Sequence, residues 1–259
     1  MKNKCLIIVA LAVLFYGSST GLAGPTMGSA QSFAVLGGST VTNTGSSVIN
    51  GDLGVSPGTA ITGFFGTVEN DGPGIVNGAI HEGDATAALA HTALIIAYTA
   101  AQTATGGVAG PANLGGAILT PGVYTYAAAA PWATAGTTLT LDALGNSSAQ
   151  WIFQIGSTLI TPASATVALI DGASANNVFW QVGTSATLGA TNAFAGSILA
   201  DKSIGLGGGT LDGRALAITG AVTISVAETI NVPTNVPEPA TMCLLGLGAM
   251  GLIRRKKVA

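Results

Sequence analysis

The feature that most constrains the fold is a short internal repeat between residues 151 and 230. Residues 151–156 match residues 178–183 almost position by position at an offset of 27, and residues 196–200 match residues 213–217 at an offset of 17. A third match, Ser203–Leu206 with Ala221–Ile224, has an offset of 18. The units alternate small, β-branched and aromatic residues between glycines. Because such short units cannot bury their inner faces alone, they must stack, and the pattern predicts a β-solenoid.

Composition agrees with a repetitive, weakly charged β-structure. Charged residues make up 7% of the chain, against roughly 25% in ordinary globular proteins. Glycine is abundant, at 38 residues, and no central apolar run reaches the ~20 residues that a membrane-spanning helix needs. The chain of 259 residues is long enough for one substantial domain.

The distribution of basic residues excludes nucleic acid as a partner. Between the two terminal segments the only basic residues are Lys202 and Arg214, so the central domain is acidic. Nucleic-acid binding requires clustered Lys and Arg to replace phosphate counterions.

Both cysteines, Cys5 and Cys243, lie in the terminal apolar segments, so we expect neither a disulfide nor thiol chemistry in the domain.

The amino-terminal segment, residues 1–23, is typical of a secretory signal peptide. Lys2 and Lys4 precede an apolar run, and Gly21 and Ala23 place small residues at the expected cleavage positions. We therefore expect an exported domain over residues 24–235, held together by its repeat core.

One long helix is predicted within this domain, at about residues 84–103. Asp84 is a suitable N-cap residue, and the Ala-rich run after it contains neither Gly nor Pro. Leu89, Ile96 and the small residues between them are predicted to form the apolar stripe that packs lengthwise on the solenoid, and Leu94, Ile95 and Tyr98 widen it.

The carboxy-terminal segment, residues 236–259, has three parts in order. Val236, Pro237, Glu238 and Pro239 form a short motif, an apolar run of residues 242–253 follows, and a basic cluster of residues 254–257 comes last. This tail resembles the Pro-Glu-Pro (PEP-CTERM) sorting signal of Gram-negative bacteria that make extracellular polysaccharide. The resemblance implies transient anchoring in the inner membrane, recognition by an exosortase-type enzyme, and release or attachment at the cell surface or outer envelope.

The domain itself resembles the bacterial and fungal ice-binding proteins of the antifreeze type. The segments that carry this resemblance are 33–36, 50–55, 119–124, 152–157, 177–183, 194–200 and 213–217. The resemblance implies a mainly β fold, a right-handed discontinuous β-solenoid of triangular cross-section, with one long α-helix packed alongside. It implies a non-enzymatic function, adsorption to ice through a flat face that bears Thr and Ser, and no cofactor.

Threonine suits an ice-binding face because its branched Cβ restricts χ1 and it presents a methyl beside a hydroxyl. The segment Thr134–Thr137 looks like a Thr-Ala/Gly-x-Thr/Asn motif found on the ice-binding faces of some family members. The candidate ice-binding residues are Thr134, Thr137, Thr184, Thr187, Thr191 and Thr219. Lys202 aligns with Thr219 in the repeat, and a long charged side chain in that column would interrupt a flat surface.

Two other functions compete with ice binding. A non-enzymatic matrix or adhesion protein could use the same fold within extracellular polysaccharide, and a groove lined with aromatics and carboxylates would favour sugar. A polysaccharide-active enzyme would need a carboxylate pair and subsite residues, for which the domain offers only Lys202 and Arg214 as cations.

Other polar residues have structural interpretations, and we assign no catalytic and no metal-binding residues. His81 and His91 lack metal-site spacing, and a solvent-facing or helix-capping role is predicted for them. Asp52 follows Asn50-Gly51 and is predicted to make a local Asx-type turn bond.

Overall fold

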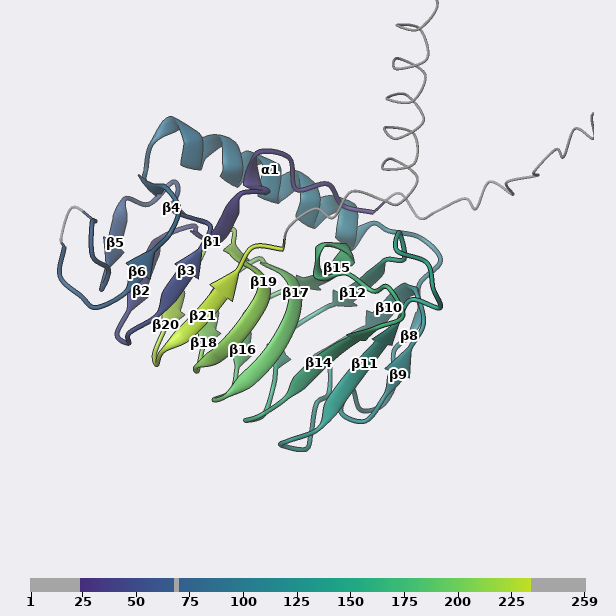
Figure 1. The fold of residues 1–259 in the computed structure, drawn as a ribbon. Helices are drawn as coiled ribbons and strands as arrows, with labels where there is room; N and C mark the ends of the chain where they lie inside the picture. Colours follow the sequence, from purple (N-terminus) through teal and green to yellow (C-terminus); the bar gives the residue numbers. More distant parts are fainter. Residues whose placement is uncertain (1–23, 68–69, 234–259) are drawn as a thin grey trace, which may run out of the picture.

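The computed structural model describes residues 24–67 and 70–233 (Figure 1). The predicted signal peptide, 1–23, and the sorting segment, 236–259, lie outside the described residues. All strand pairs are parallel, and the strands stack as the rungs of a solenoid with three faces. No helix within the described part of the chain is long and apolar enough to span a membrane.

The first face, called the helix face because α1 (Ala85–Gln102) packs on it, contains the longest run of stacked strands. In spatial order they are β7 (Ile80–Glu82), β4 (Asp52–Val55), β1 (Phe33–Gly37), the second halves of β19 (Gly209–Ala217) and β17 (Asn192–Ala200), β15 (Val178–Val182), β12 (Trp151–Ile155), β10 (Gly122–Tyr126) and β8 (Val108–Ala109).

The second face, called the six-strand face, is a separate sheet. Its strands are β13 (Leu159–Ile160), β16 (Ala186–Leu188), β18 (Ile204–Leu206), β20 (Val222–Ile224), β2 (Thr40–Asn43) and β5 (Ala60–Thr62).

The third face, called the Thr/Asn face after its outward side chains, completes the triangle. Its strands are β9 (Ile118–Leu119), β11 (Thr138–Asp142), β14 (Thr166–Ile170), the first halves of β17 and β19, β21 (Glu228–Asn231), β3 (Val48–Asn50) and β6 (Ile75–Val76).

The strand register confirms the sequence repeats. Trp151 pairs with Val178 and the next four residues follow in step, which is the predicted offset of 27. Gly196 pairs with Gly213 at an offset of 17, and Ile204 with Val222 at an offset of 18. The repeat therefore marks residues at equivalent positions on successive rungs.

The solenoid is discontinuous because the chain fills it from both ends. Strand β1 pairs with β19, so the amino-terminal coils stack directly on the carboxy-terminal ones, and β8 and β9 lie at the opposite end (Figure 1). Helix α1 follows β7 and precedes β8, so it carries the chain back along the stack. Its 18 residues span about 27 Å, which covers five to six rungs at ~4.8 Å each.

Alternation along each strand builds the core. Phe153 and Trp180 occupy paired positions on β12 and β15, are fully buried, and stack with ring centroids 3.9 Å apart. Tyr124 extends the stack, 5.6 Å from Phe153. The aromatic side chains of these rungs therefore fill the centre of the core.

Helix α1 packs through small residues and Leu94, and the larger residues at the ends of the predicted stripe face outward. Its buried residues are Ala87, Ala90, Leu94, Ala97 and Ala101. The predicted stripe residues Leu89 and Ile96 are 63% and 60% exposed, so the prediction was wrong for these two. Leu94 and the small residue Ala90, which belonged to the same predicted stripe, are buried. Alanines let the helix axis come close to Val123, Ile152, Phe179 and Leu216 of the helix face, and the larger residues are left on the outside.

Arg214 is a structural residue. Its side chain is fully buried on β19, and it donates to Gln31 O, Asn176 Oδ1 and Ser197 Oγ at 2.9–3.3 Å. It thereby ties the short helices η1 (Gly28–Ala30) and η2 (Ala175–Asn177) to the strands. Burial lowers the pKa of Arg214 to about 10, so the guanidinium remains charged at neutral pH. It offers no subsite for a sugar on the surface.

Candidate functional site

The Thr/Asn face carries two outward columns of short side chains, one residue per rung. Strand register aligns the first column from β11 to β6, and its members are Thr138, Thr166, Ala193, Thr210, Thr229, Val48 and Ile75. All of these are exposed or half-buried. The residues two positions later form the second column, which is Thr140, Ala168, Ala195, Asp212, Asn231, Asn50 and Asn77. Of these, only Ala195 is buried, at 5% exposure. Inward residues such as Phe194, Leu211 and Ile230 lie between the two columns and fill the core.

Four members of the second column form a hydrogen-bonded ladder. Asn77 Nδ2 donates to Asn50 Oδ1 at 2.8 Å, and Asn50 Nδ2 donates to Asn231 Oδ1 at 2.7 Å. Asn231 Nδ2 in turn donates to Asp212 Oδ1 at 2.7 Å. Each amide is held by the rung beside it, so the polar groups are ordered at the spacing of the strands, ~4.8 Å.

The Thr/Asn face is free of cations among the described residues. Arg214 is buried, and Lys202 lies in the turn that joins the helix face to the six-strand face, the edge opposite the Thr/Asn face. Its Nζ pairs with Asp201 Oδ2 at 3.1 Å. The interruption expected from Lys202 therefore affects the edge that carries Thr219 and does not reach the Thr/Asn face.

The candidates Thr134, Thr137 and Thr191 lie at the edge between the six-strand face and the Thr/Asn face. Thr134 and Thr191 are exposed. The Thr137 hydroxyl is used internally, because it donates to Thr134 O at 2.6 Å and accepts from Trp132 Nε1 at 2.9 Å. Thr191 bonds to Ser164 Oγ at 2.9 Å.

The other three candidates lie elsewhere. Thr187 points outward from β16, the second strand of the six-strand face, and its column continues with Gly205, Thr223, Thr42 and Thr62. Thr184 and Thr219 lie at the edge beside Lys202. The Thr184 hydroxyl is buried without a hydrogen-bond partner, and Thr219 donates to Asp201 O at 2.6 Å. The structure thus distributes the six threonines over two edges and one face.

None of the column residues was among the six candidate threonines. A signal was present, because Thr210-Leu-Asp212 and Thr229-Ile-Asn231 repeat one short pattern at an offset of 19. This pattern alternates with a period of two, and its outward residues are polar. The interpretation relied instead on a four-residue Thr motif that falls in turns.

A buried carboxyl lies where the six-strand face meets the Thr/Asn face. Glu228 begins β21 and is 3% exposed. Burial raises the pKa of Glu228 from 4.5 to about 7, although a hydrogen bond from the Gly208 backbone opposes that shift. The Glu228 side chain faces the interior, so it adds no charge to the surface of the Thr/Asn face.

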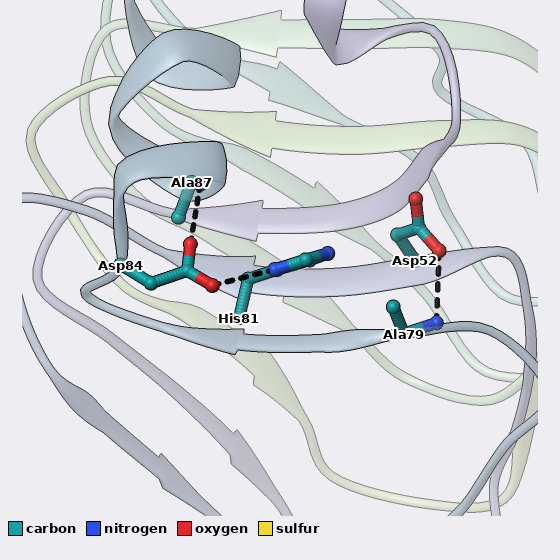
Figure 2. Close-up of polar contacts among 5 residues, drawn as sticks. All are labelled: Asp52, Ala79, His81, Asp84 and Ala87. Carbon is teal, nitrogen blue, oxygen red and sulfur yellow. Dashed lines mark hydrogen bonds and ion pairs between the residues drawn. The ribbon is translucent and has the colours of Figure 1, made fainter.

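His81 has a capping role (Figure 2). Its Nδ1 lies 2.8 Å from Asp84 Oδ2, while Asp84 Oδ1 accepts from Ala87 N at 2.8 Å. Asp84 is thus the N-cap of α1, as predicted, and the backbone bond from Ala87 is the main cause that lowers the pKa of Asp84. His91 bonds to Ile218 O at 2.7 Å. Within residues 24–67 and 70–233, no three His, Cys, Asp or Glu residues are grouped to hold a metal.

Asp52 makes a contact between rungs. Its Oδ1 accepts from Ala79 N at 2.9 Å (Figure 2), so the predicted local Asx turn at this residue was wrong. Asp212 likewise bonds to a neighbouring rung, through Asn231. These two carboxylates therefore tie adjacent coils, whereas Asp142 makes a local bond, accepting from Leu144 N at 2.8 Å.

Two family models match the chain. The model described as "Ice-binding-like" matches residues 35–231, and the model described as "PEP-CTERM protein-sorting motif" matches residues 235–257. The second match indicates export with a membrane-associated sorting signal.

Similar proteins carry the same description. An ice-binding protein of Nostoc sp. (strain HG1) is 41% identical, covering 98% of this chain and 95% of its own. The solved structure of an ice binding protein from an Antarctic biological consortium is 43% identical with a TM-score of 0.75, covering 83% of this chain and 94% of its own. The structure of an ice-binding protein from Antarctomyces psychrotrophicus, at 39% identity and a TM-score of 0.73, covers 82% and 100%. The chain belongs to the ice-binding-like family.

Proposed function

We propose that this protein adsorbs to ice through the Thr/Asn face. The observation that carries the proposal is the pair of aligned columns, which runs over seven rungs without a Lys or Arg. The columns offer mainly Thr, Ala and Asn at the strand repeat of ~4.8 Å, with Val48, Ile75 and Asp212 as the exceptions, and the two columns lie about 7 Å apart along the strand. Ordered water can bridge such regularly spaced methyl, hydroxyl and amide groups to a lattice.

The affinity arises from many weak contacts made by groups that are already ordered. Thr side chains on strands have restricted χ1 angles, and the Asn ladder fixes the amides of Asn50 and Asn231. Little conformational entropy is lost on adsorption, so the sum of small contacts appears as binding. The protein carries out no reaction in this account and uses no cofactor.

The six-strand face is the alternative ice-binding surface, with Thr187 on its second strand, β16, and Thr184 and Thr219 along its edge. Its single outward column is less regular, because Ile160 begins it and Gly205 interrupts it. Lys202 also borders this face. These features favour the Thr/Asn face, with Thr134, Thr137 and Thr191 along its edge.

Matched tyrosine variants test the choice of face. Thermal hysteresis and inhibition of ice recrystallisation are measured for the full-length chain, Thr210→Tyr on the Thr/Asn face and Thr187→Tyr on the six-strand face. Both threonines are exposed outward strand residues, so the two changes perturb folding similarly, and circular dichroism checks that they do. Activity lost in Thr210→Tyr and kept in Thr187→Tyr supports the proposal. The reverse result moves the site to the six-strand face, and an inactive parent refutes ice binding.

The terminal segments supply the route to the cell surface in this proposal. A signal peptidase removes residues 1–23, and an exosortase-type enzyme acts at the motif of Val236, Pro237, Glu238 and Pro239. The domain then reaches the cell surface, the outer envelope or the medium. Mass spectrometry of the protein recovered from each cell fraction tests this route, because an intact carboxy terminus on the surface protein would contradict it.

A further inference from the structure

A groove unrelated to the Thr/Asn face lies between the second half of α1 and the turns that join the helix face to the six-strand face. Its volume is about 640 Å³, within the ~300–1,000 Å³ range of small-ligand sites. Its lining is polar and aromatic, with Tyr98, Gln102, Tyr126, Gln154, Gln181 and Asp201 as the chief side chains.

The strand register explains why a hollow forms there. Thr125, Gln154 and Gln181 are aligned on β10, β12 and β15, in a column that becomes apolar at Leu199 on β17. Gly156 and Gly183 follow two residues after the glutamines. A Cβ on either glycine would lie 2.5 Å from a backbone oxygen of the rung beside it. No side chain can occupy these two turn positions, and the space beside the helix stays open.

The polar groups in the groove are held by the fold. Gln154 Nε2 donates to the carbonyls of Ala101, Gln102 and Ala104 at 2.8–3.1 Å, at the carboxy-terminal end of α1. Gln181 Nε2 donates to Tyr98 Oη at 2.9 Å. Burial raises the pKa of Tyr98, so its hydroxyl keeps a proton that can be donated to a ligand.

Two aromatic rings and one carboxylate complete the lining. The hydroxyl of Tyr126 is buried without a hydrogen-bond partner, and the ring is the part of this residue that can meet a ligand. The side chain of Asp201 is 33% exposed, and one of its oxygens pairs with Lys202. Aromatic faces contact the C–H surface of a pyranose ring, and carboxylate and amide groups hydrogen-bond to its hydroxyls.

We propose that this groove binds one neutral hexopyranose unit of a polysaccharide, with Tyr98 and Tyr126 against the ring and Asp201 and Gln102 on its hydroxyls. The acidic side chain disfavours uronic acids, and the single Lys202, already paired, is too little for a phosphate or sulfate ester. The groove is on a different side of the solenoid from the Thr/Asn face, so ice adsorption and sugar binding are independent of each other.

Side-chain amide signals report on this groove directly, because three of the five glutamines in the chain line it. The 15N-labelled full-length chain is titrated with the methyl glycosides of glucose, galactose and mannose to about 50 mM, and with methyl glucuronide. We expect saturable shifts of the amide signals of Gln102, Gln154 and Gln181 with at least one neutral glycoside, and weaker shifts with the glucuronide.

Two variants and a control decide the outcome. Asp201→Asn keeps the shape of its side chain, and Gln102→Ala truncates an exposed residue, so both should fold, which thermal unfolding verifies. Each should weaken the binding about tenfold, while Thr187→Ala on the six-strand face should bind as the parent does. The proposal is overturned by an absence of shifts with all three neutral glycosides, by tighter binding of the glucuronide, or by shifts that persist in both groove variants.

Discussion

Because of Glu228, the free energy of unfolding of the domain should fall as pH rises, which is the opposite of the effect that most acidic groups have. Its pKa is raised from 4.5 to about 7 in the folded protein. Between these two values the folded state binds more protons than the unfolded state, so the free energy of unfolding falls as pH rises. The loss begins near pH 4.5 and is complete above pH 7.

The magnitude follows from the pKa difference. Each pKa unit corresponds to about 1.4 kcal/mol, so the whole shift is worth about 3 kcal/mol between pH 4.5 and pH 8. Glu228→Gln removes the titration and keeps the size of the side chain. The variant should therefore lack this part of the pH dependence and be more stable than the parent at pH 8 by up to about 3 kcal/mol.

Urea unfolding of the parent and of Glu228→Gln at pH 5, 6, 7 and 8 measures the difference. The comparison cancels every contribution to the pH dependence that the two proteins share. The two free energies of unfolding should diverge steadily from pH 5 to pH 7 and then run parallel. Curves that are parallel over the whole range would refute the assignment of this pH dependence to Glu228.

Three further predictions concern what holds the domain together. Leu94 is buried at the centre of α1, so Leu94→Ala should lower the free energy of unfolding by about 2–5 kcal/mol. Leu89 is 63% exposed, so Leu89→Ala should change that free energy by less than about 0.5 kcal/mol. Equal losses for the two variants in chemical denaturation would contradict the observed helix packing. Arg214→Lys should cost at least about 3 kcal/mol, because an ammonium cannot replace the bonds that the buried guanidinium makes to η1 and η2; a variant with parental stability would show that these bonds contribute little. Asp84→Ala should lower the thermal midpoint and Asp84→Asn should restore most of it, since both Asp and Asn accept at an N-cap; identical midpoints for the two variants would argue against the capping role.

Much of the fold could be predicted from the sequence, because in a solenoid the offset between repeated segments equals the offset between paired residues on neighbouring strands. The offsets of 27, 17 and 18 between matched segments recur as strand pairs. The Ala-rich run after Asp84 likewise contained its own N-cap signal. Both features are local, or periodic along the chain, and need no knowledge of distant contacts.

The helix surface and the candidate site were harder to predict, since both depend on contacts between distant segments. Leu89 is on the outside because the helix face of the solenoid accepts alanines at close range, which composition alone does not reveal. The two columns of the Thr/Asn face join β21 to β3, nearly 180 residues apart in the chain. The order of the coils therefore decides which threonines become neighbours. Threonines in turns, such as Thr137, use their hydroxyls in local hydrogen bonds.

The most direct test of ice adsorption is the amount of protein that enters growing ice. The fluorescently labelled full-length chain and its Thr210→Tyr variant are each frozen slowly from one face under stirring, and the label in the ice is compared with that in the remaining liquid. We predict that the parent is concentrated in the ice and that Thr210→Tyr stays in the liquid. Equal partition of the two proteins would contradict adsorption through the Thr/Asn face.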